Sequence, residues 1–294
     1  MRVLVLGGTG SIGGPVVREL IRAGHEVVAL ARSAGSANAV ARIGARPIAG
    51  DMATPERWLA ALPPLDGVIH AAAAFGADDE ATERHLLQAL LPYLRSTTRT
   101  VRFIYTGGCW LYGTSDEGRV TTEATPFDPL PAFAWGVSHS QLVLGTRDID
   151  PIVIHPAMVY EPCDGVFARF RIDAIERNAV RVVAGEHVHW PLVHAEDLAT
   201  LYRLALEGSA PGECYIGAAI EGLSVGRIAR AYARRFGTRR PDPEVISADQ
   251  IAAELGEWAR GYALNQWQSG EKARRRLGWR PLHLDPLSEI HSIP

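Results

Sequence analysis

Short apolar runs alternate with longer amphipathic segments through the first half of the chain. This alternation predicts parallel strands that are buried on both faces, because helices cover the sheet on each side. After the first run, Val16, Val17 and Leu20 recur at the spacing of one helix face, and Gly24 provides a stop. We expect strands at Val3–Leu6, Glu26–Leu30, Arg46–Ile48, Gly67–His70, Val101–Thr106 and Ile152–His155, and helices at Gly13–Ala23, Pro55–Leu62, Asp78–Arg95 and Phe133–Leu144.

The rhythm changes after Pro156, where apolar runs shorten and proline and glycine become frequent. Helical patterns recur at Phe167–Asn178, Ala195–Leu206, Val225–Phe236 and Ala248–Leu255. We therefore expect an α/β protein with a doubly wound parallel sheet in residues 1–155 and a smaller C-terminal lobe in residues 156–294. Some segments of that lobe are expected to return to the first domain.

Composition places the chain in the ordinary globular class, with 294 residues of which 47% are hydrophobic and 21% charged. The formal net charge of −3 gives no basic face for nucleic acid. The densest basic run, Lys272–Arg280, is short, and we interpret it as a solvated helix face. No nucleic-acid partner is expected.

Three widely spaced cysteines, Cys109, Cys163 and Cys214, form no CxxC pair and no Cys/His cluster. Neither a disulfide framework nor a metal site is therefore expected. The opening "MRVLVLGGTG" has too short an apolar run for a secretion signal, and no apolar stretch reaches the ~20 residues of a membrane span. These features favour a cytoplasmic protein without a membrane segment.

The segment "VLVLGGTGSIGG" places Gly7, Gly10 and Gly13 between the first strand and the first helix. One glycine permits a tight turn, another lets backbone approach a pyrophosphate, and the third lets the helix pack on the strand. The helix N-terminus then offers free N–H groups to the anion. We therefore predict a dinucleotide site of the Rossmann type, in which Thr9, Ser11 and Ile12 complete the loop.

The end of the second strand, "VVALARS", should meet the adenine ribose. An acidic residue there would bind a free 2′-hydroxyl, whereas arginine would pair with a 2′-phosphate. Arg32 and Ser33 therefore favour NADP(H) over NAD(H), although Arg32 could also be a solvated loop arginine. After the third strand, Asp51 and Met52 could contact the adenine, or Asp51 could cap the following helix.

A series of motifs follows along the chain: "GGTGSIGG", "VIHAAA" at 68–73, "FIYTGGCWLYG" at 103–113, "HPAMVYEP" at 155–162, "PLVHAEDLATLY" at 191–202 and "EKARRRLGWRP". In this order and spacing the motifs resemble the extended short-chain dehydrogenase/reductases, typified by sugar-nucleotide epimerases and dehydratases. The resemblance covers almost the whole chain. It implies a nicotinamide dinucleotide on a doubly wound sheet and a small C-terminal lobe that closes over the substrate.

The resemblance also assigns positions around the cofactor. His70 and the residues Ala71, Ala72 and Ala73 would run past it, and Thr106 would lie beside the nicotinamide. Pro156, Met158 and Val159 would flank the carboxamide. His155 departs from the arginine usual before that proline, and Glu161 replaces a common glycine.

The chemical core departs further from the family. The resemblance implies a tyrosine and a lysine in a YxxxK pattern, which falls here on Trp135 and His139. The family's catalytic hydroxyl falls on Gly107 or Gly108. An indole N–H does not exchange protons near neutral pH, so Trp135 cannot be the acid. His139 could contact the nicotinamide ribose, although a tryptophan and histidine one turn apart more often pack together.

Other residues remain as candidates. Thr106 and Tyr112 join His139 as catalytic candidates, although Tyr112 and Tyr160 are more often structural in relatives. Cys109 lacks a basic neighbour that would lower its pKa. Asp116 and Glu117 are as plausible in a solvated turn as at the site. Residues expected to line the substrate pocket are Gly108, Cys109, Trp110, Trp135, His189 and Trp190, whereas His194 and Asp197 belong to the part that packs the lobe onto the sheet.

Three hypotheses follow. The first is an NADP(H)-binding oxidoreductase for a small organic substrate that works without the usual tyrosine acid. The second is a non-redox isomerase, dehydratase, epimerase or cyclase on the same fold. The third is a non-catalytic NADP(H) sensor. We expect a monomer or a homodimer, and the sequence does not identify the substrate.

Overall fold

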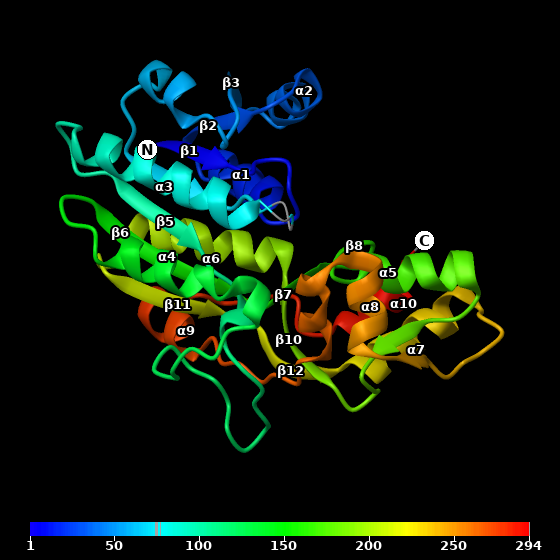
Figure 1. Cartoon of the computed structure of the whole chain (residues 1–294). Helices are drawn as coiled ribbons and strands as arrows, with labels where there is room; N and C mark the ends of the chain where they lie inside the picture. Colours follow the sequence, from blue (N-terminus) through cyan, green and yellow to red (C-terminus); the bar gives the residue numbers. More distant parts are fainter. Residues whose placement is uncertain (74–75, 77, 294) are drawn as a thin grey trace.

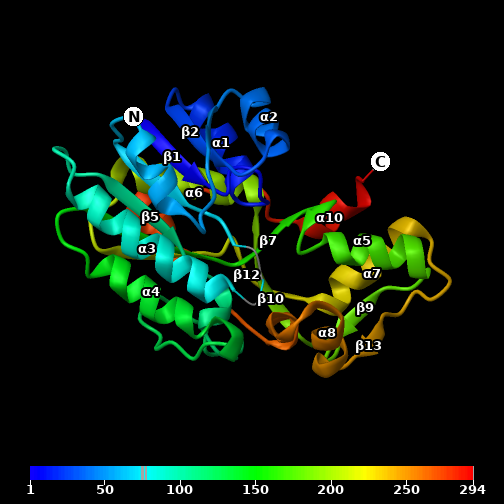
Figure 2. The same ribbon diagram turned by 45° about the horizontal axis from the view of Figure 1, so that its top comes forward.

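The computed structural model describes residues 1–73, 76 and 78–293 and shows two lobes side by side (Figures 1 and 2). The larger lobe contains a parallel sheet of seven strands in the order β11-β6-β5-β4-β1-β2-β3. Its strands are β1 (Arg2–Leu6), β2 (Glu26–Ala31), β3 (Arg46–Ala49), β4 (Gly67–His70), β5 (Arg102–Thr106), β6 (Asp150–Pro156) and β11 (Glu213–Gly217). The expected doubly wound parallel sheet is therefore confirmed.

Helices cover both faces of this sheet, because its strands are apolar on both faces. In β1, Val3 and Val5 pack with α1 (Gly13–Arg22) and α6 (Ala195–Gly208). The alternate residues Leu4 and Leu6 belong to a second core with α3 (Asp79–Arg95) and α4 (Trp135–Leu144). Figure 1 shows α3 and α4 in front of the sheet and α6 behind it.

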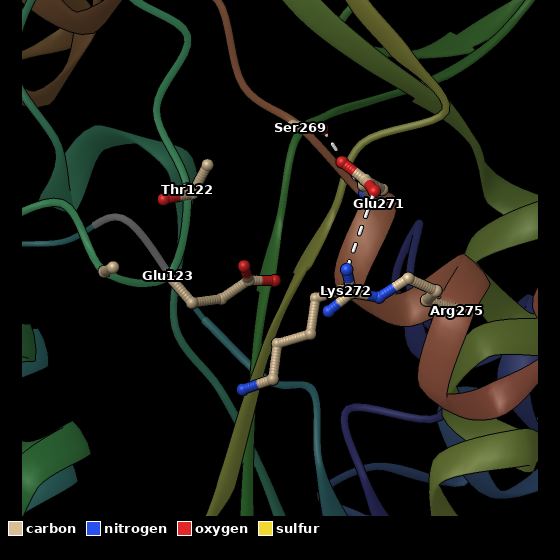
Figure 3. A pocket seen from close by; sticks show the side chains of 7 residues that line it. Thr122, Glu123, Ser269, Glu271, Lys272 and Arg275 are labelled. Carbon is tan, nitrogen blue, oxygen red and sulfur yellow. Dashed lines mark hydrogen bonds and ion pairs between the residues drawn. The ribbon is translucent and has the colours of Figure 1, made fainter.

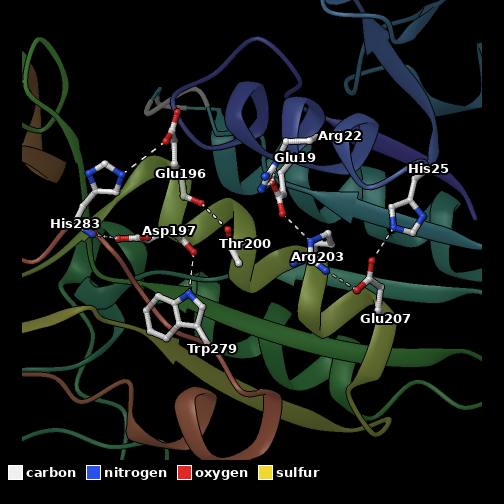
Figure 4. A network of polar contacts seen from close by, with 10 residues as sticks. All are labelled: Glu19, Arg22, His25, Glu196, Asp197, Thr200, Arg203, Glu207, Trp279 and His283. Carbon is white, nitrogen blue, oxygen red and sulfur yellow. Dashed lines mark hydrogen bonds and ion pairs between the residues drawn. The ribbon is translucent and has the colours of Figure 1, made fainter.

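Helix α6 is tied to its neighbours by polar contacts (Figure 4). Arg203 of α6 donates to the buried carboxylate of Glu19 in α1 at 2.6 Å. At the start of α6, the carboxylate of Asp197 accepts hydrogen bonds from the backbone N–H groups of Leu282 and His283. The indole of Trp279 donates to the Asp197 carbonyl at 2.8 Å. These bonds fasten the C-terminal segment to the large lobe.

The smaller lobe has its own core around Phe167, Phe170, Trp190 and Tyr232. Its sheets have the orders β12-β10-β7-β8 and β13-β9. The elements are β7 (Met158–Glu161), β8 (Asp164–Gly165), β9 (Arg181–Val183), β10 (His189–His194), β12 (Ile220–Ser224), β13 (Glu244–Ile246), α5 (Ala168–Ile172), α7 (Val225–Phe236), α8 (Ala248–Leu255) and α10 (Pro286–His291).

Segments after residue 156 also contribute to the large lobe. Strand β11, which the sequence did not predict, pairs with β6 from Glu213–Ile152 to Gly217–Pro156. Helices α6 and α9 (Glu271–Leu277) pack in the same core as α1. The two lobes are therefore not two consecutive halves of the chain.

Two local predictions were wrong. The Pro55–Leu62 segment forms two short 3₁₀ helices, η1 (Pro55–Arg57) and η2 (Leu59–Ala61), instead of an α-helix. The Trp58 indole donates to the Asp51 carbonyl at 2.8 Å, and Trp58 leaves helical geometry between the two turns. The sequence also missed α2 (Ala34–Arg42), because Val40 is its single buried residue and the segment shows no strong apolar face.

The other differences concern helix ends and one basic run. The Phe167–Asn178 pattern forms α5 followed by a π-helix at Asp173–Arg177. Within Lys272–Arg280, Arg274 donates to the carbonyls of Ala218 and Ala219, so this arginine is not merely solvated. None of the helices in the described residues is long and apolar enough to cross a membrane.

Candidate active site

The glycine loop brings three elements into backbone contact. Gly7, at the end of β1, has φ of +84°, and a Cβ there would lie 2.6 Å from the Ala71 carbonyl oxygen. A Cβ on Gly13, at the start of α1, would lie 2.1 Å from the Gly7 oxygen. Both distances are too short for any side chain. The loop, the helix N-terminus and the residues after β4 therefore meet with only backbone between them.

The N-terminus of α1 is left open by its own sequence. No side chain accepts a hydrogen bond from its first turn, and that turn has no acidic residue. Thr9, Gly10 and Ser11 of the preceding loop are exposed. Within the first turn, Gly14 N–H donates to the Gly10 carbonyl and Pro15 has no N–H, so the exposed loop and the positive end of the helix dipole are the features that suit an anion. These features fit the pyrophosphate of a dinucleotide. Ile12, the last residue of the loop, is half-buried against the core of the large lobe.

The end of β2 presents Arg32 to solvent. Arg32 has no hydrogen bond or ion pair with any described residue. The Ser33 hydroxyl instead accepts from Ser36 N at 3.1 Å and caps α2. Asp51 also has a local role, because its carboxylate accepts from Ala53 N at 2.9 Å. Met52 is half-buried and packs against the core. Of the predicted adenosine contacts after β2 and β3, Arg32 is therefore the one whose side chain has no partner among the described residues.

A buried pair that sequence reasoning missed lies behind the residues after β4. His70 Nε2 is 2.9 Å from both carboxylate oxygens of Glu83 in α3. The Ala72 N–H points at His70 Nδ1, 3.4 Å away, so Nε2 carries the proton toward Glu83. The pair orients Ala71 and Ala72 beside Gly7. A carboxylate on the apolar face of α3 was the signal available in the sequence.

The end of β5 differs at its two glycines. A Cβ on Gly107 would lie 2.2 Å from His155 Nδ1, so the buried imidazole occupies that side. Among the described residues, a Cβ on Gly108 would meet no atom within 4 Å. The Gly108 N–H donates to His155 Nδ1 at 3.3 Å. The position expected to hold a catalytic hydroxyl is thus backbone facing open space.

The two candidate hydroxyls nearby are engaged in the core. Thr106 Oγ1 lies 2.6 Å from the hydroxyl of Tyr202, a buried residue of α6. Tyr112 is buried against the rings of Phe127 and His155. Burial raises the pKa of Tyr112 well above its ordinary range. Both placements disfavour Thr106 and Tyr112 as proton donors to a substrate beside Gly108.

Helix α4 carries neither tyrosine nor lysine. The sequence has one lysine, Lys272, and its ammonium group pairs with Glu213 at 2.7 Å, away from α4 in the chain. The Trp135 and His139 rings lie 5.3 Å apart, and the Trp135 indole donates to the Ala132 carbonyl. His139 is buried, and its Nδ1 has no hydrogen-bond partner among the described residues. Burial lowers the pKa of His139 below that of an ordinary histidine.

The residues expected around the substrate are brought together in part. Cys109 is buried with its Sγ 3.7 Å from the Met158 sulfur, and burial raises its pKa to about 12. The Trp110 ring packs between the lobes on Tyr262. Trp190 is buried and donates to the Tyr262 carbonyl at 3.1 Å. His189 stacks on Trp267 on the far side of the small lobe's sheet.

The remaining predicted cofactor contacts lie at the junction of the lobes. Val159 and Ser11 line one small cavity with Ala195, which brings β7 against the glycine loop. Pro156 and Met158 are buried on either side of Ala157. Ala73 is exposed. The structure therefore gathers the predicted glycine-loop, post-β4 and post-β6 residues around one region.

The cavity drawn in Figure 3 is elsewhere, with a volume of about 400 Å³. It lies beyond the edge strand β11, between a loop and α9, whereas β1 and its glycine loop are four strands away. Its lining residues are Thr122, Glu123, Ala124, Ser269, Glu271, Lys272 and Arg275. Glu123 accepts from Ile216 N of β11 at 2.8 Å, so this carboxylate caps the sheet edge.

Among the described residues, one side-chain group has ligand atoms close enough together for a metal ion: His194, Glu196 and His283, within 4.8 Å of one another. The two imidazole rings stack at 3.7 Å with 14° between their planes. Nitrogen lone pairs in stacked rings run side by side and do not converge on one ion. His194 Nδ1 already accepts from Glu196 N. The arrangement suits a packed seam between α6 and the C-terminal segment (Figure 4).

The fold and the glycine loop define an α/β protein of the dinucleotide-binding type. A family model described as the NAD dependent epimerase/dehydratase family matches residues 3–217. The chain therefore belongs to the NAD dependent epimerase/dehydratase family.

Relatives and solved structures agree with this placement. An uncharacterized protein of Schizosaccharomyces pombe is 29% identical over 301 residues, with 99% of each chain covered. A 4-hydroxy-2-methyl-3-oxo-4-farnesyl-3,4-dihydroquinoline-1-oxide ketoreductase of Stigmatella aurantiaca is 27% identical over 224 residues, or 73% of this chain and 67% of its own. The structure of dTDP-glucose 4,6-dehydratase from Bacillus anthracis in complex with NAD matches with a TM-score of 0.84 at 16% identity, covering 99% of this chain and 95% of its own. That structural likeness supports the fold.

Gly13→Ala should disrupt the dinucleotide site, because its Cβ would overlap the Gly7 oxygen. We expect nicotinamide dinucleotide affinity to fall at least tenfold and the free energy of unfolding to fall by about 1–3 kcal/mol. The matched control is Gly14→Ala, whose Cβ would meet its nearest neighbour at an ordinary 3.7 Å. Titration by tryptophan fluorescence and urea unfolding measure both effects. Equal behaviour of the two variants would contradict the backbone contact.

His155 should make stability depend on pH. Burial lowers its pKa to about 4, below the ~6.5 of an unfolded histidine. Between these values the unfolded chain binds a proton that the folded chain does not, so the free energy of unfolding falls as pH falls from about 6.5 to 4, by about 3 kcal/mol. Urea unfolding across this range measures the slope. His155→Gln should flatten it, and an unchanged slope would show that other groups cause the dependence.

Proposed function

We propose that this protein is an NADP(H)-dependent oxidoreductase for a small organic carbonyl or enone, working without the tyrosine acid that the resemblance implies. When bound, the cofactor supplies or accepts the hydride. The open N-terminus of α1 and the backbone contact at Gly7 and Gly13 support dinucleotide binding. The likeness to a protein named as a ketoreductase supports carbonyl chemistry.

The observation that carries the proposal is the open space at Gly108. Gly108 follows the end of β5, and β5 pairs with β4 in the sheet. The residues after β4 contact the glycine loop. A carbonyl placed there would have backbone rather than a hydroxyl beside it. The described residues that reach this end therefore bind and orient the substrate, and the proton comes from water, from the substrate or from His139.

The choice of NADP(H) rests on Arg32. Its guanidinium is exposed and unengaged at the end of β2, where the resemblance places the adenine ribose. No carboxylate follows β2 to accept from a 2′-hydroxyl. An arginine pairs well with a phosphate, because its planar N–H groups match phosphate oxygens.

A second candidate is a non-redox reaction such as isomerisation or dehydration. The observation in its favour is that Thr106 and Tyr112 have core partners and so leave no hydroxyl acid at the Gly108 space. Formation of product without net change in nicotinamide absorbance would favour this reaction over the oxidoreductase.

The test of the proposed function uses purified protein and NADPH deuterated at C4 of the nicotinamide, with a panel of ketones and enones. We expect NADPH oxidation and deuterium in the product. Arg32→Glu should weaken NADPH binding about 10- to 100-fold and change NADH binding little. Arg42→Glu, an exposed change on α2, is the charge-matched control. Binding of NADPH with no oxidation across the whole panel would reject the oxidoreductase.

His139 is proposed to contact the nicotinamide ribose through its unpartnered Nδ1. His139→Ala should weaken NADP(H) binding about tenfold by loss of a hydrogen bond, whereas His139→Lys should preserve it. Ser138→Ala, an exposed neighbour on α4, is the control. Isothermal titration measures the affinities. Unchanged affinity in His139→Ala would assign His139 to packing against Trp135.

A further inference from the structure

The small lobe holds a buried cation without a polar partner. Arg169 of α5 has both terminal nitrogens, Nη1 and Nη2, buried and without a hydrogen-bond partner among the described residues. Burial lowers the pKa of its guanidinium, and the carboxylates of Asp173 and Glu254 act in the opposite direction without contacting it. A buried unpaired charge destabilises a fold, so packing alone does not explain it.

Carboxylates are present nearby but bind other arginines. Asp173 lies one helical turn after Arg169, the spacing at which a helix pairs opposite charges. At Asp173 the helix passes into the π-helix, a feature common at functional sites. The Asp173 carboxylate contacts Arg181 at 3.1 Å and Arg177 at 3.2 Å. Glu254 also pairs with Arg181, at 2.8 Å.

Aromatic rings surround the Arg169 guanidinium and connect it to the large lobe. Its central carbon lies 4.8 Å from the Tyr262 ring centroid and 5.3 Å from that of Phe170. Trp190 links these two rings, at 5.7 Å from Phe170 and 5.6 Å from Tyr262. Trp110 packs on Tyr262 at 5.6 Å. We call these four rings, Trp110, Phe170, Trp190 and Tyr262, the aromatic wall.

The aromatic wall includes a residue close in sequence to the proposed substrate position. Trp110 follows Gly108 by two residues, and a Cβ on Gly261 would lie 2.4 Å from the Trp110 ring. The backbone of the 3₁₀ helix η6 (Glu257–Ala263) therefore packs directly against the Trp110 ring at Gly261. The ring contacts thus run from Trp110, two residues after Gly108, through Tyr262 to Arg169.

The chemistry of a matching ligand follows from the guanidinium. Stacked rings contact the face of the guanidinium, whereas its N–H groups point outward in its plane. A carboxylate accepts two parallel N–H bonds in that plane, which rings cannot do. The aromatic wall is apolar, and Arg169 beside it is one cation without a carboxylate partner. This combination suits a flat monoanion better than a nucleoside diphosphate.

We propose that Arg169 anchors a single carboxylate of the substrate and that the aromatic wall contacts its flat apolar part. This inference rests on the proposed function and names its substrate class: carbonyl compounds that bear a carboxylate and an aromatic or similarly flat group. The Arg169 nitrogens are closed to solvent, so the side chains of the wall rotate to admit the ligand.

The test measures binding separately from NADPH oxidation. Benzoate, cinnamate and 2-naphthoate are titrated calorimetrically into the protein, with and without NADP⁺, each against its neutral amide. We expect each acid to bind about 10- to 100-fold more tightly than its amide, as for a charge-assisted hydrogen-bonded pair. Arg169→Gln should remove this preference, and Arg169→Lys should retain part of it.

Arg274→Gln is the matched control, because Arg274 also lies over a ring, that of Trp279, but donates to two carbonyls. We expect Arg274→Gln to lower Tm and keep the acid preference, and Arg169→Gln to lose the preference without a lower Tm. Acids that bind no better than amides, or an acid preference that survives Arg169→Gln, overturn the proposal. The titrations measure binding and require no turnover. They therefore test the role of Arg169 even if the protein fails to oxidise NADPH.

Discussion

The contact of backbone with backbone at Gly7 is the constraint on which the site depends. Gly7 touches the residues after β4, and Gly13 brings the start of α1 onto Gly7. No side chain separates the three elements, so the uncapped end of α1 opens onto the same region as Ala71 and Ala72. The buried His70–Glu83 pair supports this junction from behind.

Burial explains why the end of β5 has an unusual composition. His155 fills the space beside Gly107, and Tyr112 and Thr106 take partners inside the core. A buried polar group is stable where it has a partner, so the Thr106 hydroxyl stays with Tyr202, whereas Tyr112 is held by packing of its ring against Phe127 and His155. The buried polar atoms without a partner among the described residues include His155 Nε2 and the atoms of two residues in the proposed contacts, His139 through Nδ1 and Arg169 through its terminal nitrogens. These two residues lie in different lobes, which places the proposed cofactor and substrate contacts on opposite sides of the junction.

The lobes are joined by side chains from distant parts of the sequence. The Asp197 carboxylate accepts hydrogen bonds from the C-terminal segment, and the Trp110 ring packs against η6 at Gly261. The same C-terminal region also returns α9 to the core of the large lobe. A change in the closure of the two lobes would therefore alter the aromatic wall and the glycine-loop face together.

The sequence by itself determined the large sheet and the dinucleotide cradle, because both follow from local patterns. Apolar runs indicate buried strands, and the glycine spacing reflects contacts within a few residues. It also predicted Arg32 as a cofactor contact from its place after the second strand, and the resemblance put the YxxxK positions on Trp135 and His139. It missed β11, which is a strand through pairing with β6, and α2, whose face is scarcely buried. Only the tertiary structure placed Thr106 on Tyr202, His70 on Glu83 and Arg169 among rings, because these partners are far apart in the chain and burial decides which polar groups are left without one.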